Sequence, residues 1–279
     1  MHVRNRVAYR TIIVKRVLAL AGLLLLGSLN AAGREIGVQT PTPGGASDAF
    51  SGLMDQGRTC EGRLDPGGAL RCYLKAAGLR PDDPQVLVKI AKEYSDLTLL
   101  SSDEQENRRL MGKALEYSLR ATELEPHDAV ALLSVAVCYG KLGLYGNTRE
   151  KIEKARLVRD FAERAVAADP GYAFSHHVLG QWDYEVASLG RTKRFFIDVL
   201  YGGLPAASTD DAVRELERAV ELEPEAMCHH LALGFAYRAN ADPLKARAQF
   251  ERVLSMPCRE IYDADCRRQA AEALRGLGS

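Results

Sequence analysis

The sequence predicts an all-α solenoid in which pairs of antiparallel helices stack one on the next. Three observations predict it: a clear helix–turn–helix unit at Met227–Pro257, four upstream copies of its pattern, and an amphipathic segment after it. A pattern that recurs at a nearly fixed spacing is typical of such arrays, because one unit alone cannot bury its apolar face.

The unit at Met227–Pro257 has the spacing of a tetratricopeptide repeat. Its two helices carry the motifs His230-x-x-Leu233-Gly234-x-x-Tyr237 and Ala246-x-x-x-Phe250-x-x-Val253. Small Gly234 and Ala246 allow two helices to cross closely, while large Tyr237 and Phe250 fill the space beside the crossing. Asp242-Pro243 supplies a capping acceptor and a proline at the first helical position, which predicts the start of the second helix.

Four further copies precede this unit, each closed by a proline with an alanine five positions earlier. The closing prolines are Pro81, Pro126, Pro170 and Pro224, and the alanines are Ala76, Ala121, Ala165 and Ala219. Successive closing prolines, counted to Pro257, are 45, 44, 54 and 33 residues apart, against a repeat of about 34. The excess lies at 95–107, 144–155 and 186–209, so we expect elongated helices or extra segments there.

The tail at 262–277 predicts a capping helix. Its apolar residues fall on one helical stripe: Cys266, Ala270, Ala273, Leu274 and Leu277. A stacked array needs such a polar-faced helix at its open end. We therefore predict a tetratricopeptide-repeat-like, right-handed α-solenoid of five helix pairs with a C-terminal capping helix over 48–279, behind a Pro/Gly-rich linker at 34–47.

Residues 1–33 have the order of a secretory signal peptide: basic residues, a leucine-rich run, then small residues. This order predicts export to a periplasm or the outside of the cell. An uncleaved N-terminal helix that anchors the chain in a membrane is the alternative. An organelle-targeting segment is the third reading, although the leucine run is too apolar for one.

The charge distribution argues against nucleic acid as the partner. Residues 1–34 hold six basic residues and no acid, which leaves 31 basic and 37 acidic residues in 35–279, a net of −6. Binding to phosphate backbones needs a basic face.

Catalytic motifs are absent from the sequence, because it has no phosphate-binding loop, dinucleotide glycine pattern or nucleophile elbow. The pairs His176-His177 and His229-His230 invite a metal interpretation. However, His176 and His230 each stand four residues before the repeat glycine, and adjacent helical residues diverge by about 100°. We therefore predict no enzyme activity, no metal and no cofactor.

The concave face of the array is the first candidate for binding a partner. In tetratricopeptide arrays this face is lined by first-helix residues that do not pack inward. Here the candidates are Lys92, Lys141, His177, Gln181, Tyr184 and Arg238. Their mixture of polar and cationic groups predicts a protein or peptide partner with acidic side chains or a C-terminal carboxylate.

The insertion at 190–202 is the second candidate. Its basic residues Arg191, Lys193 and Arg194 precede the aromatic pair Phe195 and Phe196. A basic front with an apolar body suits a membrane surface or a partner groove. In the competing interpretation, the apolar residues plug the interior of the array itself.

Six cysteines are too few for a disulfide-built scaffold. For an exported protein, Cys60 with Cys72 and Cys258 with Cys266 are the candidate disulfides. The alternative is that all six are small buried apolar residues.

The segments Ala173–Ala187, Arg194–Leu200, Gly203–Ala206 and Asp211–Leu216 resemble the regulator of microtubule dynamics family. The likeness covers roughly residues 68–277, and it includes the long inter-helix insertion that ends in Leu204-Pro205. It implies an all-helical repeat domain that serves as an adaptor, with microtubule association in some eukaryotic members. The leader-like residues 1–33 depart from that setting.

Overall fold

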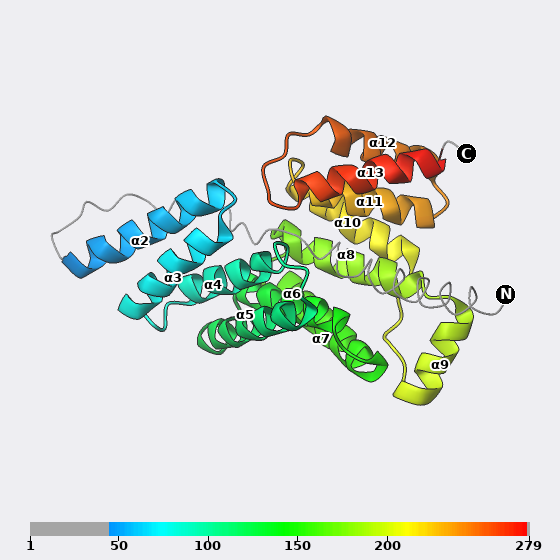
Figure 1. The fold of residues 1–279 in the computed structure, drawn as a ribbon. Coiled ribbons are helices and arrows are strands. Elements are labelled where there is room, and N and C mark those ends of the chain that lie inside the picture. The colour runs from blue at the N-terminus through cyan, green and yellow to red at the C-terminus, as the bar shows by residue number, and fades with distance from the viewer. Residues whose placement is uncertain (1–44, 278–279) are drawn as a thin grey trace, which may run out of the picture.

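The computed structural model describes residues 45–277, and within this range it contains twelve α-helices and no strand (Figure 1). The helices are α2 (Gly45–Gly62), α3 (Pro66–Leu79), α4 (Pro84–Leu97), α5 (Glu104–Leu124), α6 (Ala129–Leu144), α7 (Thr148–Ala168), α8 (Ala173–Ala187), α9 (Arg191–Tyr201), α10 (Thr209–Leu222), α11 (Met227–Ala239), α12 (Pro243–Ser255) and α13 (Asp263–Leu277). The predicted leader at 1–33 lies outside the described residues, as does the linker up to residue 44. Helix α2 begins at Gly45, so the last three residues of the predicted linker are helical.

The helices form the five predicted pairs: α2 with α3, α4 with α5, α6 with α7, α8 with α10, and α11 with α12. Helix α13 packs against α12 and α11 as the capping helix. The extra residues of the long repeats are accounted for by 21-residue helices α5 and α7 and by α9, which is inserted between α8 and α10. The all-helical solenoid is therefore confirmed.

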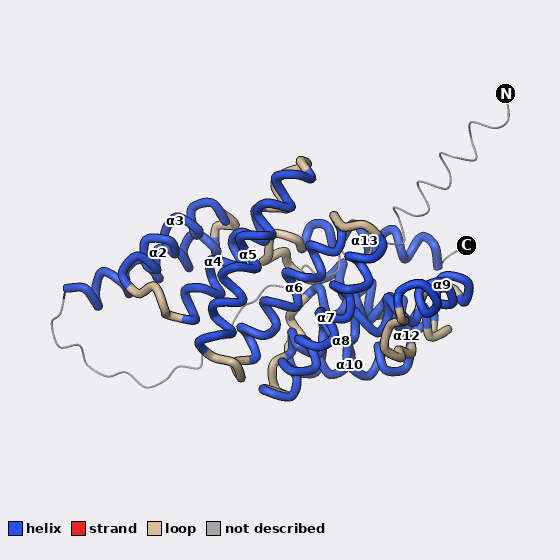
Figure 2. Tube along the Cα trace, turned by 90° about the horizontal axis from the view of Figure 1, so that it is seen from below, coloured by secondary structure: helices blue, strands red, loops and turns tan. Residues whose placement is uncertain are grey.

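The first helices of successive pairs form an inner layer. Helix α4 contacts α6, α6 contacts α8, and α8 contacts α11. The second helices contact the helices next to them along the stack, and α7 also contacts the inserted helix α9. Figure 2 shows the helices following one another along the array. Residues that point away from a partner helix can thus be covered by the first helix of the neighbouring pair.

Aspartates cap the starts of several helices, among them the predicted cap Asp242. The side chain of Asp242 accepts a hydrogen bond from the Lys245 amide at 3.0 Å, and the side chain of Asp128 accepts one from the Ala131 amide at 2.7 Å. These acceptors satisfy amides that have no partner inside the helix.

Where the two helices of a pair cross, a small residue of the first helix lies against a large residue of the second. A methyl group built on Gly234 would lie 2.5 Å from the fully buried ring of Phe250. A methyl group on Gly57 would collide in the same way with the ring of Tyr73. In the middle pairs, buried Ala91 and Ala136 occupy the equivalent positions. The repeat pattern therefore marks the helix crossings.

No helix within residues 45–277 combines the length and apolar character that a membrane crossing requires.

Replacing Gly234 with Ala should destabilise the fold by about 1–3 kcal/mol, because the added methyl must displace the ring of Phe250 in a packed interior. The matched control is Gly112→Ala in the middle of α5, where a methyl group meets nothing within 4 Å. That change should stabilise the helix by about 0.5–1 kcal/mol. Chemical denaturation measures both, and equal effects of the two substitutions would contradict the close crossing.

Candidate functional site

Four of the six predicted groove residues are not on an open surface. Lys92, Lys141, His177 and Gln181 are all buried. The physical reason is the contact between first helices, which covers side chains that a single repeat would leave exposed. The prediction that these four residues line an open groove is therefore wrong.

Lys92 is surrounded by carboxylates of the chain itself. Its Nζ lies 2.9 Å from Asp96 Oδ2, 3.2 Å from Glu93 Oε1 and 3.7 Å from Glu61 Oε1. Burial lowers the pKa of Lys92, but these carboxylates outweigh it and hold the pKa above its usual value. Glu260, from the loop between α12 and α13, lines the same small cavity. Lys92 thus neutralises internal charge and is not available to a partner.

Lys141 joins two first helices. Its Nζ donates hydrogen bonds to the backbone oxygen of Ser95, at 3.2 Å, and to the Ser95 hydroxyl. Gln181 donates from Nε2 to Glu185 Oε1 at 3.0 Å. Of the predicted groove residues, partly buried Tyr184 and exposed Arg238 remain at the surface. The Arg238 guanidinium lies 4.9 Å from the centroid of the Phe235 ring.

Helix α9 stands away from the stack, and none of its residues is buried (Figure 1). The exposed fractions of Phe195, Phe196, Val199 and Leu200 are 61%, 53%, 63% and 60%. These four residues therefore do not plug the interior of the array, contrary to the competing interpretation. Of the other apolar residues of the insertion, partly buried Ile197 borders a pocket of the array. Arg191 and Lys193 are also exposed, and Arg194 is partly buried.

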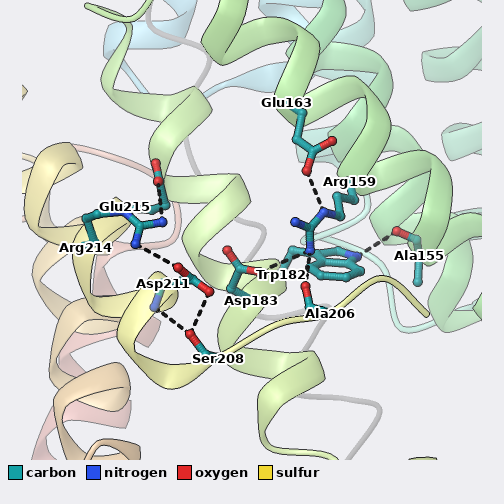
Figure 3. A network of polar contacts seen from close by, with 10 residues as sticks. All are labelled: Ala155, Arg159, Glu163, Trp182, Asp183, Ala206, Ser208, Asp211, Arg214 and Glu215. Atoms are coloured by element: carbon teal, nitrogen blue, oxygen red, sulfur yellow. Dashed lines mark hydrogen bonds and ion pairs between the residues drawn. The ribbon is translucent and has the colours of Figure 1, made fainter. Parts of the chain in front are cut away.

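Two arginines of α7 fasten the segment that follows α9 to the array. Arg156 donates from Nε to the Gly203 oxygen at 3.0 Å. Arg159 donates from Nη1 to the Ala206 oxygen at 2.7 Å (Figure 3). The chain turns through Gly202 and Gly203 at φ values of 75° and 78°, a conformation that favours glycine. Sequence reasoning missed both arginines, although their spacing of three places them on one face of α7.

Arg159 also packs over Trp182, with its guanidinium carbon 4.6 Å from the ring centroid. The indole Nε1 donates to the Ala155 oxygen at 2.7 Å, and Arg159 Nη1 lies 3.4 Å from Asp183 Oδ1 (Figure 3). Burial raises the pKa of Asp183 to about 6, although Arg159 opposes the rise. At the base of the insertion, α7, α8 and the segment after α9 are therefore held together by packing and hydrogen bonds.

An apolar pocket of about 160 Å³ lies between α6, α7 and α8. Ile197 and Leu204 of the insertion form part of its lining. Gln181 and Glu185 are polar groups at its wall, and burial raises the pKa of Glu185 to about 7. The pocket thus offers an apolar space beside a carboxyl group that titrates near neutrality.

The repeat-position histidines have equivalent structural roles. His176 Nε2 bonds the Pro170 oxygen at 3.0 Å and its Nδ1 bonds Glu215 at 2.8 Å. His230 Nε2 bonds the Pro224 oxygen at 2.9 Å and its Nδ1 bonds Gln249 at 2.7 Å. Repeat register therefore explains one histidine of each pair, as predicted.

The other histidine of each pair lies between the helices. His177 of α8 and His229 of α11 are fully buried, with their Nδ1 atoms 3.1 Å apart. Together with Cys228 they form the one group in the described part of the chain whose spacing would suit a metal ion. Sequence reasoning missed this contact because it considered only the adjacent members of each pair.

The six cysteines are free thiols, so neither candidate disulfide is present in the structure. Burial raises the pKa of the Cys60 thiol, and the neighbouring Cys72 adds to the rise. Cys258 is exposed and Cys266 is buried.

Glu185→Gln should flatten the pH dependence of stability. Between the ordinary pKa of 4.5 and the folded pKa of about 7, the folded chain keeps a proton that the unfolded chain has released. Stability therefore falls as pH rises through that window, and the amide removes this contribution. Thermal melts from pH 4.5 to pH 8 should show a smaller decline for Glu185→Gln than for the unmodified chain.

The matched control is Glu221→Gln, at a carboxylate whose side chain is 65% exposed. This variant should follow the unmodified chain at every pH. Parallel curves for all three proteins would contradict the raised pKa of Glu185.

Comparison with known proteins gives a family match. The family model described as "Regulator of microtubule dynamics protein 1-3" matches residues 53–278. Regulator of microtubule dynamics protein 1 of Bos taurus is 28% identical over 198 residues, which span 70% of this chain and 62% of that protein. The Mus musculus protein of the same name is 27% identical, over 70% of this chain and 65% of that one. The matches thus span less than two thirds of these relatives.

Among solved structures, a thermophilic TPR (tetratricopeptide-repeat) protein of Thermus thermophilus superposes with a TM-score of 0.59 at 20% identity. The superposition covers 81% of this chain and 99% of that one. At this identity the likeness shows the fold alone.

Proposed function

Because the chain belongs to the regulator of microtubule dynamics protein 1-3 family, we propose that it is a non-catalytic scaffold that binds a protein or peptide partner. The observation that carries this proposal is the continuous inner layer of first helices, which offers a repeat-built surface. Export or anchoring through residues 1–33 stays a prediction.

The part of this surface that we assign to the partner is the pair Tyr184 and Arg238. They lie on α8 and α11, which contact each other, and the Arg238 guanidinium lowers the pKa of the Tyr184 hydroxyl against the rise that burial causes. An exposed guanidinium beside aromatic rings suits a carboxylate at a peptide's C-terminus or on its side chains.

Arg238→Glu should reduce capture of carboxylate-ended peptides at least about tenfold, because a like charge replaces the cation that pairs with the carboxylate. Retention on an array of peptides that end in a free carboxylate measures the effect. Arg275→Glu, an exposed position on capping helix α13, is the matched control and should bind normally. Equal retention by Arg238→Glu and the control, or no retained peptide at all, would contradict the assignment.

A second candidate function is attachment to an anionic membrane surface through α9. The observation that favours it is the apolar face formed by Phe195, Phe196, Val199 and Leu200, which has cations at its N-terminal end. Exposed apolar patches of this kind mark interaction sites, and a basic amphipathic helix lies well at a lipid interface. The segment 202–206, which follows α9 and is hydrogen-bonded to Arg156 and Arg159, would connect the attached helix to the array.

The double substitution Phe195→Ser with Phe196→Ser should abolish co-sedimentation with vesicles that contain anionic lipid. It removes apolar area that would enter the interface but leaves the stack untouched, because neither ring is buried. Leu244→Ser is the matched control, since Leu244 on α12 is 80% exposed. If wild-type protein does not sediment with anionic vesicles, or sediments equally after the double change, this second function fails.

A further inference from the structure

Three side chains with metal-binding atoms meet between the fourth and fifth helix pairs. His177 lies on α8, and Cys228 and His229 lie in the first turn of α11. The two histidines are fully buried and Cys228 is 6% exposed. None of these residues has a part in the peptide surface or in α9, so the cluster calls for its own explanation.

The spacing of the three ligand atoms suits a zinc ion. The Nδ1 atoms of His177 and His229 are 3.1 Å apart, and Cys228 Sγ lies 3.6 Å from His229 Nδ1. The ligand atoms of all three residues lie within 4.8 Å of one another. Bond lengths of about 2.0–2.1 Å to nitrogen and about 2.3 Å to sulfur, at tetrahedral angles, require similar separations.

The second ring nitrogen of His229 adds an independent observation. His229 Nε2 is buried and makes no hydrogen bond, yet it lies 3.5 Å from Glu223 Oε2. Histidines that bind a metal through one nitrogen usually donate from the other to a carboxylate. Glu223 therefore lies where such a carboxylate would be expected, beside the ring nitrogen that does not face Cys228 and His177.

A hydrogen-bonded pair of neutral histidines is the competing explanation. It accounts for the contact between His177 and His229, but it leaves the position of the Cys228 sulfur and the approach of Glu223 unexplained. We propose that His177, Cys228 and His229 bind a Zn²⁺ ion that ties α8 to α11, with Glu223 as the carboxylate that orients His229.

Zinc is bound by the neutral ring of a histidine and by the thiolate of a cysteine. Binding therefore replaces the S–H bond of Cys228 with a Zn–S bond and releases the thiol proton to solvent, so affinity should rise with pH.

The test uses the full chain, stripped of metal by a chelator and then dialysed against Zn²⁺. Elemental analysis should find one zinc per chain. Replacement with Co²⁺ should give a thiolate-to-cobalt charge-transfer band, which Cys228→Ser abolishes. Glu223→Gln should weaken zinc affinity by about 10–100-fold while keeping the band.

Two matched controls should keep both the zinc and the band. His230→Gln changes the adjacent histidine, which bonds Gln249 and Pro224, and Cys138→Ser changes a buried cysteine of another helix pair. If a variant fails to fold, the melting temperature of the unmodified chain still tests the proposal. Its melting temperature should rise with Zn²⁺ and fall with chelator. No retained zinc, no cobalt band and an unchanged melting temperature would overturn the proposal.

Discussion

The close crossing of two helices within each repeat is the constraint on which the rest of the structure depends. A glycine or alanine of the first helix lies against a large side chain of the second, as Gly234 does against the buried ring of Phe250. Because these crossings recur, the first helices come to lie beside one another, from α4 through α6 and α8 to α11. The proposed partner surface, the support of the insertion and the buried histidine contact all depend on that inner layer.

Pairing within a repeat could be predicted from the sequence, because the small residue, the aromatic residue and the closing proline all lie in one short stretch. Contacts between repeats could not. Lys92 and Lys141 read as groove cations, but one is enclosed by Asp96, Glu93 and Glu61, and the other is bonded to Ser95 of the neighbouring pair. A repeat pattern says nothing about which residues face each other across the next interface.

The orientation of the insertion could not be predicted from its sequence either. Its composition predicts an amphipathic helix, but no pattern within 190–202 decides whether its apolar face turns inward or outward. The orientation of α9 depends on residues outside the insertion. Trp182 packs at its base, and Arg156 and Arg159 of α7 hold the segment 202–206 that follows α9. Helix α9 therefore projects from a rigid support, and this arrangement suits a scaffold that carries an attachment element.

Hydrogen–deuterium exchange across the intact chain tests this account most directly, because it measures the opening of each helix separately. We expect slow exchange in α6, α8 and α11, because their amides open only when stacked pairs separate. Fast exchange is expected in α9, which has no buried residue. Exchange in α9 as slow as in α8, or fast exchange throughout α6 and α11, would contradict a packed array with a projecting helix.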